Sequence, residues 1–485
     1  MIDTHCHLDM FPGDGDTRGV SGEEKRDAVI RRAKDIGIEA IITIGSDFES
    51  NVTNIAIAGQ YDIAYVAVGV HPHDAKTFND SVLEQLKIWT SPSFRVPLAK
   101  HEKRRVDSFA GKGTRETKIV AVGETGLDYH YDHSPREVQR EVFRKHLALA
   151  NEKVLPVVVH SRKAKEDTLA ILKESGTSKG VLHCFSGDID MAEKVMEMGL
   201  YVSFAGPVTF RNAKALAEIV KEIPDDYLLA ETDAPYLAPE PLRGKINEPA
   251  HIIHTMRKLA ELREVSTDDI VRITTLNARR LFGVGILPSR GEIAYSIRDS
   301  LYLNITNRCT NKCSFCVRFH GDYVKGHNLR LADEPTEEEL IRAIGDPMLF
   351  REIVFCGYGE PLLRIDTVKK VAAWIKEKGG RVRINTNGHG NLIHRRNILP
   401  ELCNIVDSVS VSLDAHDEAT YNRICAPAFK DAFREVISFI RASKDYIPKV
   451  QATVVEMEGV DMEQCRKITD ELGVTLRVRK LDVVG

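Results

Sequence analysis

The chain has 485 residues, of which 43% are hydrophobic and 28% charged, and its formal net charge is −4. This composition is that of a soluble globular protein long enough for two large domains, and it excludes the basic excess of proteins that coat long nucleic acids. A protein that binds only a nucleic-acid end or a short oligomer needs fewer basic groups, so a nuclease stays compatible with this charge.

The first residues, Met1-Ile2-Asp3-Thr4-His5, contain no basic region followed by an apolar run, and no run of 18 or more apolar residues occurs. We therefore expect neither a secretory signal nor a membrane span. Nine cysteines are present, and three of them form one tight cluster. This usage suits a reduced, cytoplasmic protein with a metal site better than a disulfide framework.

In the first half of the chain, eight short β-rich runs alternate with helical patterns. The runs lack period-two alternation, which is typical of strands buried on both faces of a parallel sheet. They cover residues 2–7, 40–45, 64–70, 119–124, 155–160, 180–183, 201–205 and 227–232. Eight strand–helix units predict an α/β fold of the closed (β/α)8 TIM-barrel type over residues 1–285.

One irregular segment, residues 90–118, interrupts the barrel pattern. Its part from 100 to 118 carries seven Lys or Arg and three Asp or Glu. We expect a solvated loop here, and a flap that contacts phosphate is the alternative.

A passage rich in Gly and Pro, residues 283–291, follows the barrel pattern. Such composition marks a domain boundary, so we place a linker at 286–298 and a second domain at 299–485. Six further strand–helix repeats follow, with strands expected at residues 301–306, 353–357, 382–386, 408–413, 450–455 and 475–480. Six repeats predict an open, partial (β/α)6 barrel.

Histidines and carboxylates recur at the expected carboxyl ends of the first-domain strands, and these are His5, His7, Glu124, His160, His183 and Asp233. The carboxyl ends of barrel strands meet at one rim, where the active sites of such barrels lie. Four imidazoles and two carboxylates are a natural ligand set for one or two divalent ions (Mg, Zn or Mn), with Glu124 as the expected bridge. Asp233 could accept a proton from the attacking water, so Glu124 and Asp233 are the candidate catalytic residues.

Six motifs surround these residues in order: THCHLD (4–9), GVHPH (69–73), GETGLDY (123–129), HSR (160–162), HCFSG (183–187) and ETDAPYL (231–237). With them, residues 1–283 resemble the TatD-type metal-dependent deoxyribonucleases of the amidohydrolase superfamily. The resemblance implies phosphodiester hydrolysis of DNA with Mg²⁺ or a similar ion, and ligand roles for all six residues. The long segment 90–118 departs from the family pattern and puts the substrate preference, rather than the metals, in doubt.

Two further residues of this domain are candidate substrate contacts. Arg162 could hold a phosphate through a charged fork, although an ordinary surface ion pair is equally compatible with its position. His71 follows the third strand and could reach a phosphate, or it could cap and pack locally. The expected substrate is DNA, at its ends or as a short oligonucleotide.

The second domain carries Cys309, Cys313 and Cys316 at C-x₃-C-x₂-C spacing. Three thiolates can hold an iron–sulfur cluster and leave one iron without a protein ligand. Structural zinc with His320 as a fourth ligand is the alternative for this segment alone. Polar sets at the ends of the following strands favour a cofactor site.

Together these features resemble the radical S-adenosylmethionine (radical SAM) superfamily over about residues 295–485. The resemblance implies a 4Fe–4S cluster on the three cysteines, and S-adenosyl-L-methionine bound near Phe315, Gly357, Gly359, Glu360, Asn385, Asn387 and Ser412. Reductive cleavage of this cofactor would yield a 5′-deoxyadenosyl radical that acts on an unknown substrate, with an electron donor such as flavodoxin or ferredoxin. The motif usually written Gly-Gly-Glu reads Gly-Tyr-Gly-Glu here.

We therefore predict a bifunctional enzyme whose arrangement resembles TatD-associated radical SAM proteins. Two alternatives stay open for the first domain. It could hydrolyse small amides or lactones, as related barrels do, or it could be a non-catalytic scaffold that presents nucleic acid to the radical site. The complete ligand set argues against the scaffold.

Overall fold

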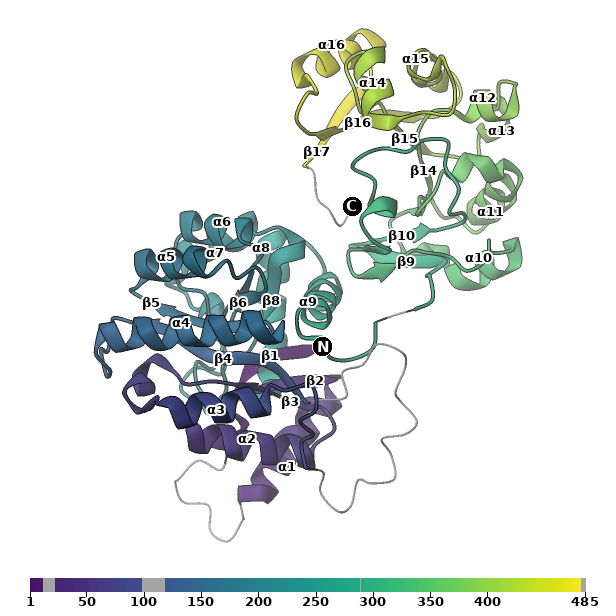
Figure 1. Cartoon of the computed structure of the whole chain (residues 1–485). Helices are drawn as coiled ribbons and strands as arrows, with labels where there is room; N and C mark the ends of the chain where they lie inside the picture. The colour runs from purple at the N-terminus through teal and green to yellow at the C-terminus, as the bar shows by residue number, and fades with distance from the viewer. Residues whose placement is uncertain (12–21, 98–117, 288, 481–485) are drawn as a thin grey trace. The chain divides into compact units, whose positions relative to one another are not determined.

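A computed structural model describes residues 1–11, 22–97, 118–287 and 289–480 of the chain (Figure 1). These residues belong to two compact units, Met1–Leu287 and Pro288–Gly485. Most of the segment 90–118, predicted as a solvated loop or flap, lies outside the described residues. Within the described ranges, no helix combines the length and the apolar character that a bilayer crossing requires.

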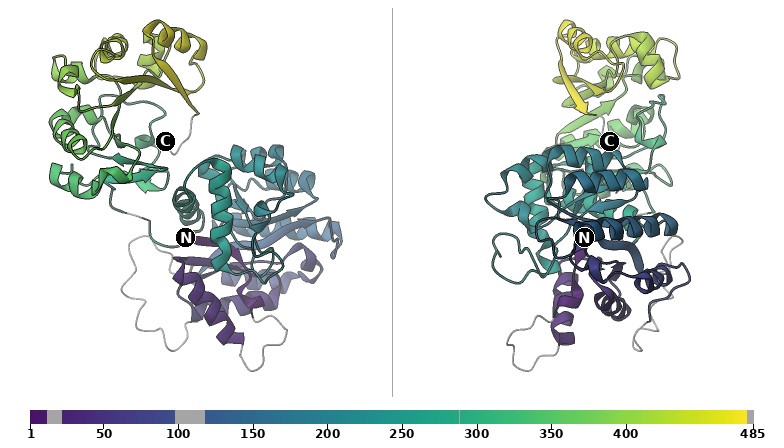
Figure 2. Two further views of the ribbon diagram at one scale, coloured as in Figure 1. Left: turned by 180° about the vertical axis from the view of Figure 1, so that it is seen from behind. Right: turned by 60° about the vertical axis from the view of Figure 1, so that its left-hand side comes forward.

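The first unit is built on an eight-stranded sheet in which the strands follow one another in chain order (Figures 1 and 2). All neighbouring strands that pair do so in parallel, and they are β1 Ile2–Cys6, β2 Ala40–Ile44, β3 Ala64–Val68, β4 Ile119–Asp128, β5 Val157–Arg162, β6 Gly180–Leu182, β7 Tyr201–Phe204 and β8 Leu228–Ala230. The helices are α1 Gly22–Asp35, α2 Phe48–Gln60, α3 Asp80–Trp89, α4 Arg136–Lys153, α5 Lys165–Ser175, α6 Ile189–Glu197, α7 Lys214–Glu222, α8 Ile252–Arg263 and α9 Thr267–Phe282. The predicted (β/α)8 architecture is thereby confirmed.

The sheet turns back on itself, so that its first and last strands meet. An isolated parallel bridge joins Cys6 to Ala234, just beyond the end of β8. The backbone N–H of His7 donates to the carbonyl of Ala234 at 2.8 Å, and the N–H of Asp233 donates to the carbonyl of His5 at 2.9 Å. The seam of the barrel therefore coincides with three of the predicted metal ligands.

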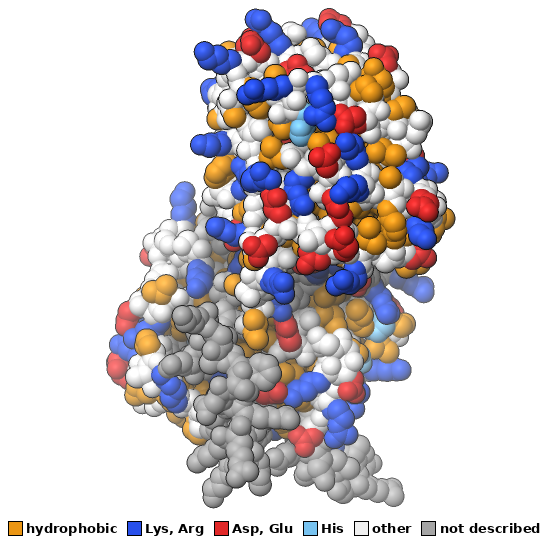
Figure 3. Space-filling view, turned by 90° about the vertical axis from the view of Figure 1, so that its right-hand side faces the viewer, with side chains coloured by type: hydrophobic (Ala, Val, Ile, Leu, Met, Phe, Trp, Pro, Cys, Tyr) orange, Lys and Arg blue, Asp and Glu red, His pale blue; other side chains and the backbone are white. Residues whose placement is uncertain are grey.

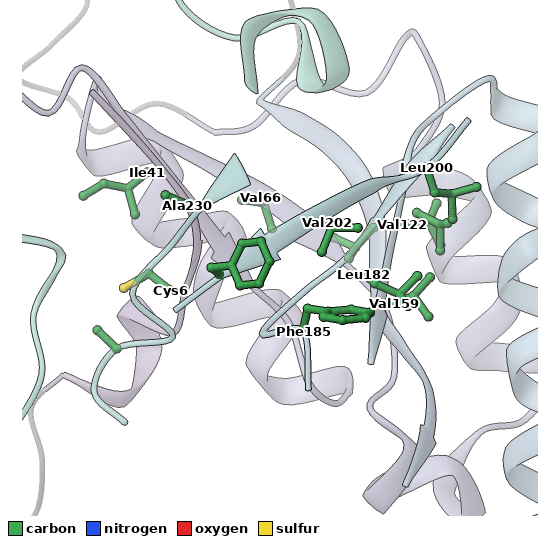
Figure 4. Packing of buried hydrophobic residues seen from close by; sticks show 14 of the residues in the cluster. Cys6, Ile41, Val66, Val122, Val159, Leu182, Phe185, Leu200, Val202 and Ala230 are labelled. Carbon is green, nitrogen blue, oxygen red and sulfur yellow. The ribbon is translucent and has the colours of Figure 1, made fainter. Parts of the chain in front are cut away.

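The strands of this unit are buried along almost their whole length. Apolar side chains of successive strands, among them Ile41, Val66, Val122, Val159 and Val202, pack into one cluster together with helix residues (Figure 4). β-branched side chains fit such pleated surfaces well, and burial on both faces explains why the sequence shows apolar runs without alternation. This packed scaffold fixes the positions of the strand ends.

The second unit is built on a seven-stranded sheet in the order β17-β16-β15-β14-β13-β10-β9. Its strands are β9 Ala294–Ile297, β10 Ser300–Leu303, β13 Ile353–Phe355, β14 Val382–Thr386, β15 Ser408–Ser412, β16 Lys449–Glu456 and β17 Thr475–Lys480, with a separate pair β11 Tyr323–Val324 and β12 His327–Asn328. Its helices are α10 Glu337–Ile344, α11 Ile365–Glu377, α12 Gly390–His394, α13 Leu399–Leu402, α14 Glu418–Cys425, α15 Ala432–Ser443 and α16 Met462–Leu472. Six of the seven sheet strands run parallel, as the predicted partial barrel requires.

The sheet of the second unit starts earlier than predicted. Residues 294–297, predicted to lie in a linker at 286–298, form strand β9, which pairs antiparallel with β10. A short antiparallel strand at the edge of a parallel sheet needs no crossover helix, so the strand–helix repeat that reveals its neighbours is missing. The sheet of the second unit therefore begins before the predicted boundary at residue 299.

Candidate functional site

The predicted ligands of the first unit come together at the carboxyl ends of its strands. Their nitrogen and oxygen atoms form three groups, each with all ligand atoms within 4.8 Å of one another: His5–Glu124–His183, His5–His7–Asp233 and His71–Glu124–His160. His71, predicted as a substrate contact, is thus grouped with Glu124 and His160. Glu124 and His160 lie inside their strands rather than at the ends, because β4 continues to Asp128 and β5 to Arg162.

Glu124 lies at the centre of this arrangement. Its Oε1 is 2.6 Å from His183 Nε2, 2.9 Å from His160 Nδ1 and 3.5 Å from His71 Nε2. Its Oε2 is 3.5 Å from His5 Nε2. The two oxygens therefore face different histidines, which is the geometry of a carboxylate able to bridge two cation positions.

Asp233 completes the other side of the cluster. Its Oδ1 lies 3.5 Å from His7 Nε2 and 3.6 Å from His5 Nε2. The residue has a φ of 55°, in the left-handed region that Asp tolerates better than most side chains. The backbone bond to His5 across the barrel seam and the buried Asn247 amide, which donates to the Thr232 carbonyl at 2.8 Å, hold this turn in place.

Two carboxylates that the sequence analysis did not assign support these histidines. Asp128 Oδ2 lies 3.2 Å from His160 Nε2 and 3.0 Å from His73 Nε2. The fully buried Glu231 accepts hydrogen bonds from the Cys184 N–H and the Ser203 hydroxyl, both at 2.6 Å, and lies 3.4 Å from His183 Nδ1. Both belong to quoted motifs, but their spacing alone does not separate a supporting carboxylate from a ligand.

The pKa shifts in this cluster run in both directions: those of Glu124 and His71 are lowered, whereas carboxylate partners outweigh burial and raise those of His160 and His183. Burial raises the pKa of the Glu124 carboxyl, but the nearby His183 and His71 outweigh it and hold that pKa well below its ordinary value. Burial lowers the pKa of His71 to about 3. Anionic carboxylate and neutral imidazole are the forms that bind metal ions.

Histidine nitrogens without hydrogen-bond partners also indicate that this cluster can bind divalent ions. Both ring nitrogens of the fully buried His5 and the Nδ1 of His7 lack a hydrogen-bond partner among the described residues. Buried polar atoms without partners are rare, because each carries a desolvation cost, and a bound metal ion is one of the accepted explanations. We take these nitrogens as evidence that the cluster is a metal centre.

Arg162, the other predicted substrate contact, is exposed at the end of β5. Its guanidinium lies over the ring of Tyr131 at 4.8 Å from the ring centre. Stacking on an aromatic face leaves the N–H groups of the guanidinium directed outward, so an anion above the rim could still be bound.

In the second unit, the three cysteines lie on the loop that follows β10, and each is partly exposed. The Cys309 Sγ accepts from the Asn311 N–H at 3.4 Å. The loop docks on helix α14, where Lys312 and Ser314 donate their N–H groups to the carbonyls of Cys425 and Ile424, both at 2.9 Å. His320, the alternative zinc ligand, has its Nε2 3.0 Å from the Ser314 carbonyl oxygen.

A polar network joins this loop to the ends of β13 and β14. The Asn387 Nδ2 donates to the Thr310 hydroxyl at 2.8 Å and lies 3.8 Å from the Cys309 Sγ. Glu360 is 3% exposed and accepts from the N–H groups of Asn387 and Leu362 and from the Thr386 hydroxyl. Burial raises the pKa of Glu360 to about 7. Both of its oxygens are thus occupied by groups of this chain.

The two glycines of the Gly-Tyr-Gly-Glu motif allow close backbone approach. A Cβ at Gly357 would lie 2.3 Å from Asn304 Oδ1, and one at Gly359 would lie 2.2 Å from the Arg308 carbonyl oxygen. Side chains at either position would therefore displace the strand end or the loop that leads to Cys309. The glycines bring β13 against the cysteine loop.

The remaining predicted cofactor contacts are more spread out. Asn385 Oδ1 accepts from Arg383 Nη1 at 2.8 Å, and Phe315 packs against the core of the second unit. Ser412 ends β15 and is half-buried. Their roles toward a cofactor stay predictions.

Behind the cysteine loop lies a buried support that was not predicted from the sequence. The fully buried His389 has its Nδ1 2.9 Å from the Thr310 hydroxyl and its Nε2 3.0 Å from the Tyr421 hydroxyl. The Asn311 amide donates to that same tyrosine hydroxyl at 3.1 Å. Burial lowers the pKa of His389 to about 4, so the ring is neutral and able to accept a hydrogen bond. No local signal marks these partners, because Asn311 and Tyr421 are 110 residues apart.

The fold and these two sites define a metal-dependent hydrolase joined to a radical SAM domain. The chain belongs to the TatD related DNase family, whose model matches residues 2–283, and the model of the radical SAM superfamily matches residues 303–472. Membership implies divalent metal ions for the first unit, and S-adenosylmethionine with an iron–sulfur cluster for the second.

Three of the similar proteins each match 59% of the chain. The uncharacterized metal-dependent hydrolase YabD of Bacillus subtilis is 41% identical over 286 residues, which are 59% of this chain and 99% of the relative. The uncharacterized metal-dependent hydrolase YcfH of Escherichia coli K12 is 35% identical, over 59% of this chain and 96% of the relative. The crystal structure of YjjV, a TatD homolog from Escherichia coli K12, is 31% identical with a TM-score of 0.49, over 59% of this chain and 98% of that chain.

Proposed function

We propose that the first unit hydrolyses phosphodiester bonds of DNA, at strand ends or in short oligonucleotides, with two divalent ions of the Mg, Zn or Mn type. His5, His7, Glu124, His160, His183 and Asp233 would hold these ions. The observation that carries the proposal is the position of Glu124, whose Oε1 faces His183, His160 and His71 and whose Oε2 faces His5.

Bound divalent ions would supply polarisation of a phosphoryl oxygen and acidification of the attacking water. The chain itself would contribute the Asp233 carboxylate as the proton acceptor, because it lies at the open side of the cluster next to His7. Asp128 and Glu231 would fix the ring orientations of His160 and His183, as carboxylates near ligating histidines generally do. Arg162 and His71 would hold the anionic substrate.

A direct assay tests this proposal. Purified full-length protein is loaded in turn with Mg²⁺, Mn²⁺ and Zn²⁺ and given end-labelled single-stranded and duplex oligonucleotides, a small amide and a lactone. We expect metal-dependent release of nucleotides, with the amide and the lactone unchanged. Cleavage of the amide or the lactone, but not of the oligonucleotides, would contradict the proposal and favour the alternative of amide or lactone hydrolysis. No turnover of any substrate would favour the scaffold alternative.

For the second unit, we propose that Cys309, Cys313 and Cys316 hold a 4Fe–4S cluster and that residues at the strand ends bind S-adenosylmethionine. The supporting observation is the network that ties Cys309 and Thr310 to Asn387 and Glu360 at the ends of β13 and β14. When bound, these cofactors supply a 5′-deoxyadenosyl radical once one electron arrives from a donor such as flavodoxin or ferredoxin.

Anaerobic purification tests the radical site. Iron and sulfide analysis and electron paramagnetic resonance of the reduced protein, before and after addition of S-adenosylmethionine, report the cluster and its free iron. We expect about four irons for each chain and a spectrum that changes on addition of the cofactor. A colourless protein containing zinc would contradict the cluster. To test whether the two sites share a substrate, the hydrolysis assay and the radical assay are carried out with the same oligonucleotide.

A further inference from the structure

The sheet of the second unit has two chemically different faces. On β14, Val382 and Ile384 belong to the apolar core shared with the helices, whereas Arg383 and Asn385 alternate with them. On β16, Ala452 and Val454 are in that core, whereas Lys449 and Gln451 are not. Period-two alternation places the polar side chains together on the face that the helices do not cover.

A cavity of about 490 Å³ opens at the amino-terminal ends of strands β13 to β17. This is the opposite end of the sheet from the cysteine loop, which joins the strands where they finish. The basic side chains in its lining are Arg351, Arg381, Arg383, Lys449 and Arg477. The acidic ones are Glu352 and Asp407. The volume is within the range of small-molecule sites, roughly 300–1,000 Å³.

Both acidic groups already have partners within the protein. Glu352 Oε1 lies 3.0 Å from Arg383 Nε. Asp407 pairs with Lys376 at 2.6 Å and accepts from the Val382 N–H at 2.7 Å. The lining therefore has an excess of positive charge that its own carboxylates do not neutralise.

Arg383 is the fixed group of the cavity. It is 8% exposed, and its guanidinium contacts Glu352, the Asn385 Oδ1 at 2.8 Å and the Tyr302 hydroxyl at 3.3 Å. Contacts with three different side chains hold the planar group in one orientation, which lowers the entropy cost of ordering it on binding.

Three further cations have no such partner. Arg381, Lys449 and Arg477 come from the beginnings of β14, β16 and β17, and each is exposed. Within the part of the chain that the structure describes, none of them has an acidic side chain at salt-bridge distance. On the face of this unit that the upper part of Figure 3 shows, basic and acidic side chains are interspersed. Converging unpaired cations repel one another until an anion lies between them.

We propose that this cavity binds a small phosphate-bearing anion, separately from the metal centre and the cofactor site. Arginine forks match the geometry of phosphate oxygens, and several converging cations require a ligand with more than one negative charge. Pyrophosphate and a nucleoside 5′-monophosphate satisfy this description, and inorganic phosphate is the minimal case.

Calorimetric titration of the full-length, cluster-loaded protein with pyrophosphate tests the proposal. The variants are Arg477→Gln, Lys449→Gln and the double variant, because both side chains are exposed and their loss leaves the core intact. The matched control is Arg441→Gln, an exposed arginine on α15. We expect binding at least about tenfold weaker in the double variant and unchanged in the control.

A second control separates this cavity from the first unit. Asp233→Ala disrupts the metal centre, where a phosphate product would also bind, and should leave pyrophosphate binding at the cavity unchanged. Binding that is lost in Asp233→Ala but kept in the double variant would overturn the proposal. Titrations with inorganic phosphate, a nucleoside 5′-monophosphate and a 12-residue oligonucleotide define the ligand. If only the oligonucleotide bound and the double variant abolished that binding, the site would be a nucleic-acid contact and the small-anion proposal would fall.

Discussion

The two candidate sites differ in what carries their ligands. In the first unit, histidines and carboxylates come from strands or from the first residues after them, and they are within ligand distance of one another without an ion. In the second unit, the cysteines lie on a loop that hydrogen bonds attach to α14 and β14. The packed barrel therefore fixes the candidate ligands of the first unit, whereas the positions of the cysteines depend on a loop and on the hydrogen bonds that hold it.

The largest effect is expected from loss of one loop cysteine. Cys313→Ser removes one of three thiolates, and we expect loss of the bound iron and of all S-adenosylmethionine cleavage, measured by iron analysis and by 5′-deoxyadenosine formation. Hydrolysis by the first unit should continue unchanged. Cys403→Ser, a half-buried cysteine outside the loop, is the control. Iron retained in Cys313→Ser would contradict the comparison of the two sites, because iron binding by the loop would then not depend on Cys313.

In the first unit, Asp233→Asn keeps the shape of the side chain and removes its charge. We expect the rate of oligonucleotide hydrolysis to fall by about 10²–10⁴-fold, because the proposed proton acceptor is lost. Circular dichroism should not change, since the rim is held by packing. Glu166→Gln, an exposed residue on α5, serves as the control. A variant with normal turnover would remove Asp233 from the catalytic role.

The stability of the first unit should depend on pH through a buried histidine that is not a proposed metal ligand. His146 has its Nδ1 2.8 Å from the Val142 carbonyl, and its Nε2 accepts from the Val70 N–H next to His71. Burial lowers the pKa of His146 to about 4, below the unfolded value of 6.5. The neutral ring therefore stabilises the fold above pH 6.5, and this contribution is lost as the pH falls toward 4, by about 3 kcal/mol in total.

Urea unfolding at several pH values measures this loss. In a Trp374→Phe background the single remaining tryptophan is Trp89, which is buried in the first unit and reports on it alone. His146→Gln should flatten the dependence between pH 6.5 and 4. An unchanged slope in that variant would assign the pH dependence to other groups.

The smallest effect is expected behind the cysteine loop. Tyr421→Phe removes a hydroxyl that contacts His389 and Asn311, which is worth about 0.5–1.5 kcal/mol. In air, the cluster of this variant should bleach up to roughly tenfold faster, as measured by the loss of its visible absorbance. The iron content after anaerobic preparation should be unchanged. Tyr446→Phe is the control. An identical bleaching rate would mean that the loop is not held by this network.

The strands and most of the first site could be predicted because their signals are local. Apolar runs mark buried parallel strands, and residues just after them must meet at one rim, as His7, His183 and Asp233 do. The support by Asp128, Glu231 and Tyr421 could not be predicted, because it depends on contacts between distant segments. Strand β9 was missed for a related reason: four residues with no helix after them give no repeat to detect.

Strand β9 also has a practical consequence for anyone who wishes to express the radical half by itself. A fragment trimmed to begin at residue 299 would leave the outer backbone groups of β10 without their partner strand. Bare sheet edges recruit other chains, so such a fragment should self-associate. Starting the fragment a few residues before Ala294 keeps the edge protected, and gel filtration of the two versions would show the difference.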